Sequence, residues 1–190
     1  MTVTEIAPSL RDEREIALVV VATPLGPLAH AIDAYRQAVA VRFGTNTAHR
    51  DEAHCLLVRT YHDHPSSVDA YQSLLSATVT DAQRQRGHRW VMVTELSTLD
   101  LWHGLEIESP ALLALAVGFA ARASASTRAR EISRQDRLRL TLAADFDVAN
   151  HDALSELAHR IVDPGLTAEW QVGLWQSNGG AWTPVWRENR

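Results

Sequence analysis

The chain begins with a polar segment that is followed by a run of β-branched residues. Residues 1–14 show no periodicity, whereas 16–22 read IALVVVA. A continuous apolar run of this kind is typical of a central strand that is covered on both faces. Thr23-Pro24 interrupts the run, and apolar residues then recur at helical spacing over 28–41. We therefore predict a strand at 16–22 and a helix at 28–41.

A second strand and a second helix follow the first pair. Residues 53–62 read AHCLLVRTYH, which is rich in strand-forming residues, and the HDHPSS segment that contains Pro65 ends the run. Ser66 or Ser67 can cap a helix that continues toward Arg86. The first half of the chain is therefore predicted as strand, helix, strand, helix.

The second half begins with two further strands. Residues 88–109 are rich in strand-forming residues and are long enough for two strands, and Pro110 then opens the apolar helix ALLALAVGFAARA. From Arg137 to Leu142, arginine or threonine alternates with leucine. This period of two predicts a strand with one polar and one apolar face.

A fourth helix and a hairpin complete the chain. The helix is predicted from Asn150 or Asp152 to Val162, and the segments EWQVGLWQ and AWTPVW form the hairpin around a Ser-Asn-Gly-Gly turn. The order of elements predicts an α+β fold. With 190 residues, of which 46% are hydrophobic, the chain is expected to form one domain over 15–190 after a polar lead at 1–14.

The balance of charge argues against general nucleic-acid binding. All 18 basic residues are arginines, against 23 acidic residues, which gives a formal net charge of −5. A domain of this charge has no overall basic field to attract a nucleic-acid backbone. Arginine can nevertheless bind a carboxylate or a phosphate through two parallel hydrogen bonds, so an anionic small molecule remains a suitable partner.

Cysteine content and the start of the chain bear on its location. Cys55 is the only cysteine, so neither an intrachain disulfide nor a cysteine-based zinc site can form. The start has no basic segment before an apolar stretch, and the run at 16–22 is too short for a membrane span. We expect a cytoplasmic protein that is neither exported nor inserted into a membrane.

The common motifs of nucleotide-binding proteins, serine hydrolases and zinc proteases are absent. Four histidines do lie close together in the sequence, namely His49, His54, His62 and His64. However, eight residues of extended strand separate His54 from His62 by about 26 Å, so the two cannot share a metal ion. We predict no metal site and no cofactor.

Two strand segments 85 positions apart resemble each other: His54-Cys55-Leu56-Leu57 and Arg139-Leu140-Thr141-Leu142. Each is followed by a turn and a helix. This organisation resembles the two-histidine phosphoesterase superfamily, which includes cyclic phosphodiesterases and RNA ligase-like proteins and in which each half carries a His-x-Thr/Ser-x strand. The segment LWHGLEIESPALLALAVGF and the closing hairpin also resemble that family, so the resemblance extends from residue 16 to residue 186.

The resemblance implies two pseudo-symmetric βα lobes around a central cleft, with one motif strand from each lobe lining the cleft. In active members of the family, the two histidines serve as general base and general acid, and the two hydroxyl groups hold the phosphate. Displacement at phosphorus needs one group to take a proton and another to give one.

Two of the four motif positions in this chain depart from the family pattern. His54 matches the first histidine, but Leu56 stands at the position of the first hydroxyl group. Thr141 matches the second hydroxyl group, but Arg139 stands at the position of the second histidine. Because arginine does not lose its proton at physiological pH, the symmetric acid–base mechanism cannot operate.

Several residues are candidates for the cleft. We expect His54 to be the catalytic residue, and Arg139 and Thr141 to bind substrate because they share one face of a strand, with Arg137 near the cleft mouth. Trp102 could stack a ligand ring, and His103 lies beside it in sequence. Equally, these side chains could be ordinary packing residues or solvated residues of a strand.

Three functions are compatible with this sequence. The first is a divergent enzyme of small-molecule metabolism that binds an anionic or polar organic substrate in the cleft and is not a standard phosphodiesterase. The second is a cyclic phosphodiesterase that acts on nucleotide or RNA ends. The third is a non-catalytic ligand-binding or regulatory protein. A second histidine or carboxylate within reach of the ligand would favour an enzyme. The substrate and the oligomeric state do not follow from the sequence.

Overall fold

The computed structural model of the chain describes residues 15–86, 91–126, 132–166 and 168–189, and leaves out the side chains of residues 85, 86 and 126. The predicted polar lead at 1–14 and the start of the segment 88–109 lie outside these residues. The strands are β1 (Ile16–Leu25), β2 (Cys55–Asp63), β3 (Met92–Leu99), β4 (Trp102–Glu108), β5 (Leu138–Ala144), β6 (Glu169–Ser177) and β7 (Thr183–Arg187). The helices are α1 (Pro27–Phe43), α2 (Val68–Arg86), α3 (Pro110–Ser126) and α4 (His151–Ile161).

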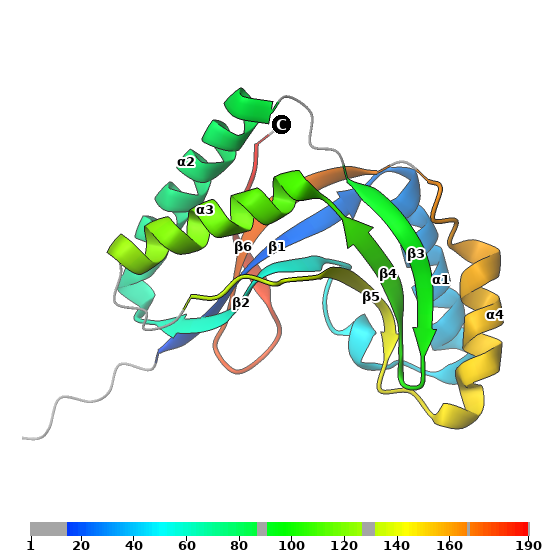
Figure 1. Cartoon of the computed structure of the whole chain (residues 1–190). Coiled ribbons are helices and arrows are strands. Elements are labelled where there is room, and N and C mark those ends of the chain that lie inside the picture. Colours follow the sequence, from blue (N-terminus) through cyan, green and yellow to red (C-terminus); the bar gives the residue numbers. More distant parts are fainter. Residues whose placement is uncertain (1–14, 87–90, 127–131, 167, 190) are drawn as a thin grey trace, which may run out of the picture.

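The strands form one antiparallel sheet in the order β3-β4-β5-β2-β1-β6-β7 (Figure 1). As the β-branched run predicted, β1 is an inner strand, paired with β2 on one side and with β6 on the other, and is almost entirely buried. It continues through Pro24 to Leu25. Proline is tolerated there because pairing with β2 ends at Ala22, so Pro24 lies where only β6 is a neighbour.

The sheet has one face that is covered by helices and one that is not. Alternate residues of the strands, such as Leu18, Leu105 and Leu140, belong to a single hydrophobic core with buried residues of all four helices. The intervening residues point to the other face, where a small separate cluster contains Val19 and Trp175. Helices therefore cover the first face, and the second face is available for a cleft.

The helices form two pairs. α2 packs against α3, and α1 packs against α4, and Figure 1 shows the two pairs over different parts of the curved sheet. No helix in the described part of the chain is long and apolar enough to span a membrane. The start of α2 agrees with the predicted cap position, because the helix begins directly after Ser67. Before it, Pro65–Ser67 forms a 3-10 turn in which the N–H of Ser66 donates to Nδ1 of His64, and α2 begins at Val68.

The two parts of the sheet meet at the predicted motif strands. β5 continues into β4 and β3, and β2 continues into β1, β6 and β7. β2 and β5 are joined through one registered pair, Cys55 and Leu140, and each of the two strands is followed by a helix along the chain. The mixed α+β architecture with two strand-and-helix parts is therefore confirmed, and the two motif strands lie side by side.

Candidate functional site

The register between β2 and β5 brings the four motif positions together. Because Cys55 pairs with Leu140, antiparallel geometry puts His54 opposite Thr141 and Leu56 opposite Arg139, all on the face that the helices leave open. Cys55 itself points into the core, where burial raises the pKa of its thiol to about 12. The thiol is therefore not a nucleophile at neutral pH.

A pocket of about 210 Å³ adjoins His54 and Thr141. Its polar lining comes from α1, from the segment before β2 and from the middle of β5: Arg36, Thr47, Asp51, Glu52, His54 and Thr141. Two small side chains, Ala48 and Ala144, leave the space open. The sequence pointed to His54 and Thr141 only, and the other polar residues reach the pocket through the tertiary fold.

His54 has a defined tautomer in this pocket. Its Nδ1 lies 2.8 Å from the carbonyl oxygen of Glu52, which can only accept, so Nδ1 carries the hydrogen and Nε2 has the lone pair. Burial lowers the pKa of His54, although the bond to Glu52 and the charge of Asp51 act in the opposite direction. The ring also contacts Trp175 edge-on, with centroids 4.8 Å apart. His54 is therefore a neutral base at physiological pH.

Arg139 forms part of an ordered group on β4 and β5. Its Nε donates to Oε1 of Glu106 at 2.7 Å, and its guanidinium lies over the ring of Trp102, 5.2 Å from the centroid. The side chain is 40% exposed. The predicted anchor thus lies on the cleft face, but a carboxylate of the protein already neutralises part of its charge.

Thr141 is oriented by the same tryptophan. The indole Nε1 of Trp102 donates to Oγ1 of Thr141 at 3.0 Å, so the hydroxyl hydrogen of Thr141 remains available to a ligand. The indole lies against Gly104, where a Cβ would collide with it, and Arg139 lies over its ring. Trp102 therefore contacts both Thr141 and Arg139, and its stacking on a ligand ring stays a prediction.

Arg36 links the pocket walls. Its Nη1 donates to the carbonyl oxygen of Asp51 at 2.9 Å and its Nη2 donates to that of Thr141 at 3.0 Å. The carboxylate of Asp51 in turn accepts from the backbone N–H of Trp182 through Oδ1. These bonds fix the segment before β2 against β5 and against the β6–β7 hairpin.

Two of the predicted binding residues lie elsewhere. His103 is fully buried on the helix-covered face, where its ring contacts Phe146 and His151. The expectation that His103 lies in the cleft is corrected, because successive residues of a strand point to opposite faces and Trp102 occupies the cleft side. Arg137 is exposed and precedes β5. It has no contact with the pocket among the described residues.

The side chain of Leu56 lies in apolar surroundings. It packs with Val19, Val21, Trp175 and Trp182 on the open face of the sheet. A leucine at this position extends an apolar surface beside His54, where the family pattern has a hydroxyl group. The first motif therefore holds a base next to an apolar wall.

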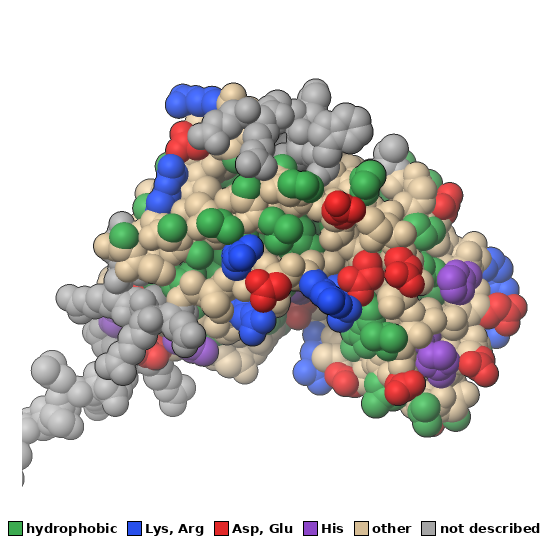
Figure 2. Space-filling view, viewed as in Figure 1, with side chains coloured by type: hydrophobic (Ala, Val, Ile, Leu, Met, Phe, Trp, Pro, Cys, Tyr) green, Lys and Arg blue, Asp and Glu red, His purple; other side chains and the backbone are tan. Residues whose placement is uncertain are grey.

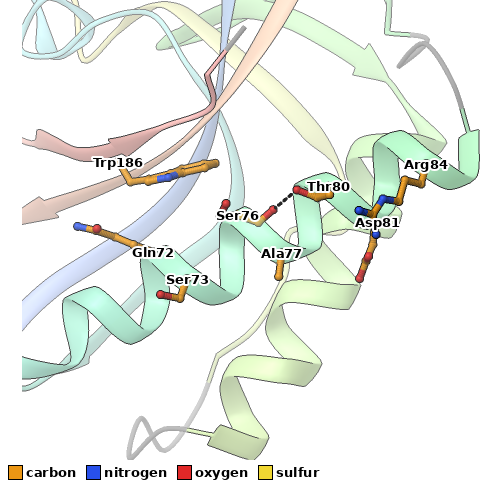
Figure 3. A pocket seen from close by; sticks show the side chains of 8 residues that line it. All are labelled: Gln72, Ser73, Ser76, Ala77, Thr80, Asp81, Arg84 and Trp186. Carbon is orange, nitrogen blue, oxygen red and sulfur yellow. Dashed lines mark hydrogen bonds between the residues drawn. The ribbon is translucent and has the colours of Figure 1, made fainter.

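A second cavity, of about 610 Å³, lies between α2 and β7 (Figure 3). Its lining includes Ser76, Thr80 and Trp186, and its Asp81 is bridged to Arg122. No histidine or cysteine lines it. In the described part of the chain, no three histidine, cysteine or acidic side chains are placed to hold a metal ion. The pocket at His54 is thus the stronger candidate for chemistry.

Comparison with known proteins adds evidence on the fold. No protein-family model matches the chain, and no curated protein matches it in sequence. Among solved structures, E. coli LigT in its apo form is similar, with a TM-score of 0.57 and 15% identity over 92% of this chain and 97% of that chain. E. coli LigT complexed with 3′-AMP gives a TM-score of 0.57 and 14% identity over 92% and 98% of the two chains.

These matches cover almost all of both chains, and the paired motif strands, the four helices and the closing hairpin have the order that the resemblance implied. At this level of identity the likeness concerns the fold. The chain therefore has the two-histidine phosphoesterase fold of E. coli LigT.

Proposed function

We propose that this protein is an enzyme that acts on a small anionic or polar organic molecule in the pocket on the open face of β2 and β5. His54 transfers the proton, and Arg139 and Thr141 bind the substrate. The observation that carries this proposal is the fixed tautomer of His54, whose Nδ1 is held by Glu52. A neutral imidazole with a free Nε2 in a pocket is suited to general-base catalysis.

A second polar group besides His54 is available in the pocket, and it is a hydrogen-bond acceptor rather than a proton donor. Arg139 cannot supply a proton at neutral pH. Asp51 is a carboxylate that lines the same pocket as His54, and its Oδ2 has no hydrogen-bond partner among the described residues. A carboxylate within reach of the same ligand favours an enzyme over a binding protein. The single buried cysteine is consistent with a cytoplasmic location, which we propose as well.

Substitution of Arg139 tests the binding role. We expect Arg139→Ala to weaken binding of anionic ligands about tenfold, because one charge-assisted hydrogen bond contributes about 1.5–3 kcal/mol and a partly exposed group gives the lower value. Arg139→Lys should recover only part of the affinity, since an ammonium group lacks the two-pronged geometry. Calorimetric titration of organic carboxylates and phosphate esters measures both changes. Unchanged affinity in Arg139→Ala would remove the anchor from the proposal.

Cyclic phosphodiesterase activity is the second candidate, and two observations favour it. E. coli LigT, which has the same fold, has been solved with 3′-AMP, and His54 and Thr141 keep two of the four motif positions. We nevertheless expect negligible hydrolysis of nucleoside 2′,3′-cyclic phosphates, since loss of one acid–base group costs about 10²- to 10⁴-fold. Robust hydrolysis that disappears in His54→Ala would instead make phosphodiester cleavage the function.

A further inference from the structure

The charges around the cleft restrict the ligand further. Resting on the proposed function, we propose that the cleft selects a small hydroxylated molecule with a single negative charge. The anionic group lies at Arg139, and the hydroxyl groups lie at Asp51 and at Nε2 of His54. A carboxylate and a phosphodiester share this chemistry.

A row of three charged residues crosses the open face of the sheet. Glu95 pairs with Glu106 between β3 and β4, and Glu106 pairs with Arg139 between β4 and β5. Residues paired directly across strands point to the same face, so two carboxylates and one guanidinium lie in line. The row has a net charge of −1. It therefore repels a ligand with two negative charges at Arg139 more strongly than a ligand with one. In Figure 2 the lower edge of the molecule is hollowed, and basic and acidic side chains lie beside the hollow.

Arg139 retains donors for one anionic group. Glu106 accepts from its Nε, and neither Nη atom has a partner among the described residues. The stacking of the guanidinium over Trp102 limits its orientation. Two parallel N–H groups match the two oxygens of a carboxylate or of a phosphodiester.

The pocket beside Arg139 offers both acceptors and donors to a ligand. Both Nη atoms of Arg36 donate to carbonyl oxygens of the protein, and Glu52 is bridged to Arg187 at 2.6 Å. Oδ2 of Asp51 and Nε2 of His54 remain as acceptors without a partner among the described residues. Among the described residues, Nε of Arg36 is a buried donor without a partner, and the hydroxyl hydrogen of Thr141 is also available. A ligand group that both donates and accepts hydrogen bonds, as a hydroxyl group does, therefore fits this pocket.

The dimensions fit a short molecule. Arg139 and Thr141 are two residues apart on one strand, which corresponds to about 6.6 Å. The pocket volume of about 210 Å³ lies below the range of about 300–1,000 Å³ that is typical of sites for drug-sized ligands. A short carbon chain with several hydroxyl groups and one terminal anionic group matches a site of this size.

Four probes test the ligand class by calorimetric titration at about pH 8, where a phosphate monoester is a dianion. Gluconate carries one carboxylate and hydroxyl groups, and cytidine 2′,3′-cyclic phosphate carries one charge as a phosphodiester. Glucose 6-phosphate adds the second charge, and acetate lacks the hydroxyl groups. We expect gluconate or the cyclic phosphate to bind at least about tenfold more tightly than glucose 6-phosphate and acetate, and the stronger of the two identifies the anionic group.

Two variants assign the selectivity to residues. Glu106→Gln should improve the affinity for glucose 6-phosphate about tenfold more than that for gluconate, because it removes one negative charge beside Arg139. Asp51→Asn should weaken the binding of gluconate about tenfold and leave the affinity for acetate unchanged, because only gluconate places hydroxyl groups in the pocket. Glu156→Gln on the exposed side of α4 also removes one negative charge, but on another element. It should change neither the affinity for glucose 6-phosphate relative to gluconate nor the affinity for gluconate relative to acetate.

Three results would overturn the ligand class. They are tighter binding of glucose 6-phosphate than of both monoanions, an effect of Glu106→Gln that equals that of Glu156→Gln, and an absence of binding by all four probes. The proposed function is judged separately, because it survives any of these results if Arg139→Ala still weakens binding of another small molecule. It fails if no small molecule binds in the cleft at all.

Discussion

Replacement of Gly104 by alanine should destabilise the protein by about 3 kcal/mol or more. A Cβ at this position would lie 2.5 Å from the carbonyl oxygen of Leu140 and would also collide with the indole of Trp102. The first contact is with backbone of the neighbouring strand, so a side-chain rotation cannot relieve it. Overpacking of this kind typically costs about 1–3 kcal/mol, and more where the backbone must move. Urea unfolding followed by circular dichroism measures the loss.

Two further variants separate the causes. Gly118→Ala in α3 places a Cβ at an ordinary 3.4 Å from Cγ2 of Thr78, and should be neutral or stabilise the protein by up to about 1 kcal/mol. The double variant Trp102→Ala with Gly104→Ala lacks the indole, but its new Cβ still collides with the carbonyl oxygen of Leu140. We therefore expect the double variant to be less stable than Trp102→Ala alone. A change of less than about 0.5 kcal/mol in Gly104→Ala would contradict the close packing of β4 on β5.

Acid should destabilise the protein through His103. Burial, and to a lesser degree His151 and His159, lower the pKa of His103 to about 4 in the folded state, against about 6.5 in the unfolded chain. The folded state therefore binds fewer protons, so this contribution to stability is complete above about pH 6.5 and is lost as the pH falls through 4. The difference corresponds to about 3 kcal/mol. Unfolding free energies measured between about pH 7.5 and pH 4 report it.

His103→Leu provides the comparison. Both ring nitrogens of His103 are buried without a hydrogen-bond partner among the described residues, so leucine should cost little at neutral pH and should flatten the decline in acid. His62→Gln on the exposed side of β2 should keep the wild-type decline. If His103→Leu lost stability with pH as steeply as the wild type, the buried neutral histidine would not be the cause.

Local patterns predicted most of the elements. The β-branched run predicted β1 as a central strand, and alternation predicted β5 with Arg139 and Thr141 on one face. The first pattern follows from burial of nearly every residue of β1, and the second follows from burial of alternate residues of β5 over Leu138–Leu142. The predicted cap at Ser66 or Ser67 placed the start of α2 correctly at Val68, whereas the His64 side chain that bonds to the preceding 3-10 turn was not predicted.

Most of the site could not be predicted, because its residues come together only in the tertiary structure. The hydrogen bond between Arg36 and Thr141 joins residues 105 positions apart in the sequence, and the bond between Asp51 and Trp182 joins residues 131 positions apart. No local pattern indicates such contacts. One signal was available: alternation within β4 puts Trp102 and Glu106 on one face and His103 on the other, so the same rule that placed Arg139 would have excluded His103.

The state of the His54 ring tests the account most directly. Nitrogen-15 NMR of the histidine side chains, assigned with His54→Gln, gives the tautomer, the pKa and the response to a bound ligand. We expect the Nδ1-protonated neutral form at pH 7, a pKa below the ordinary value of about 6.5, and a shift of the Nε2 signal when a ligand such as gluconate binds. A hydrogen on Nε2, a pKa above 6.5, or a signal that does not change while a ligand binds would contradict the role of His54 as the base of this cleft.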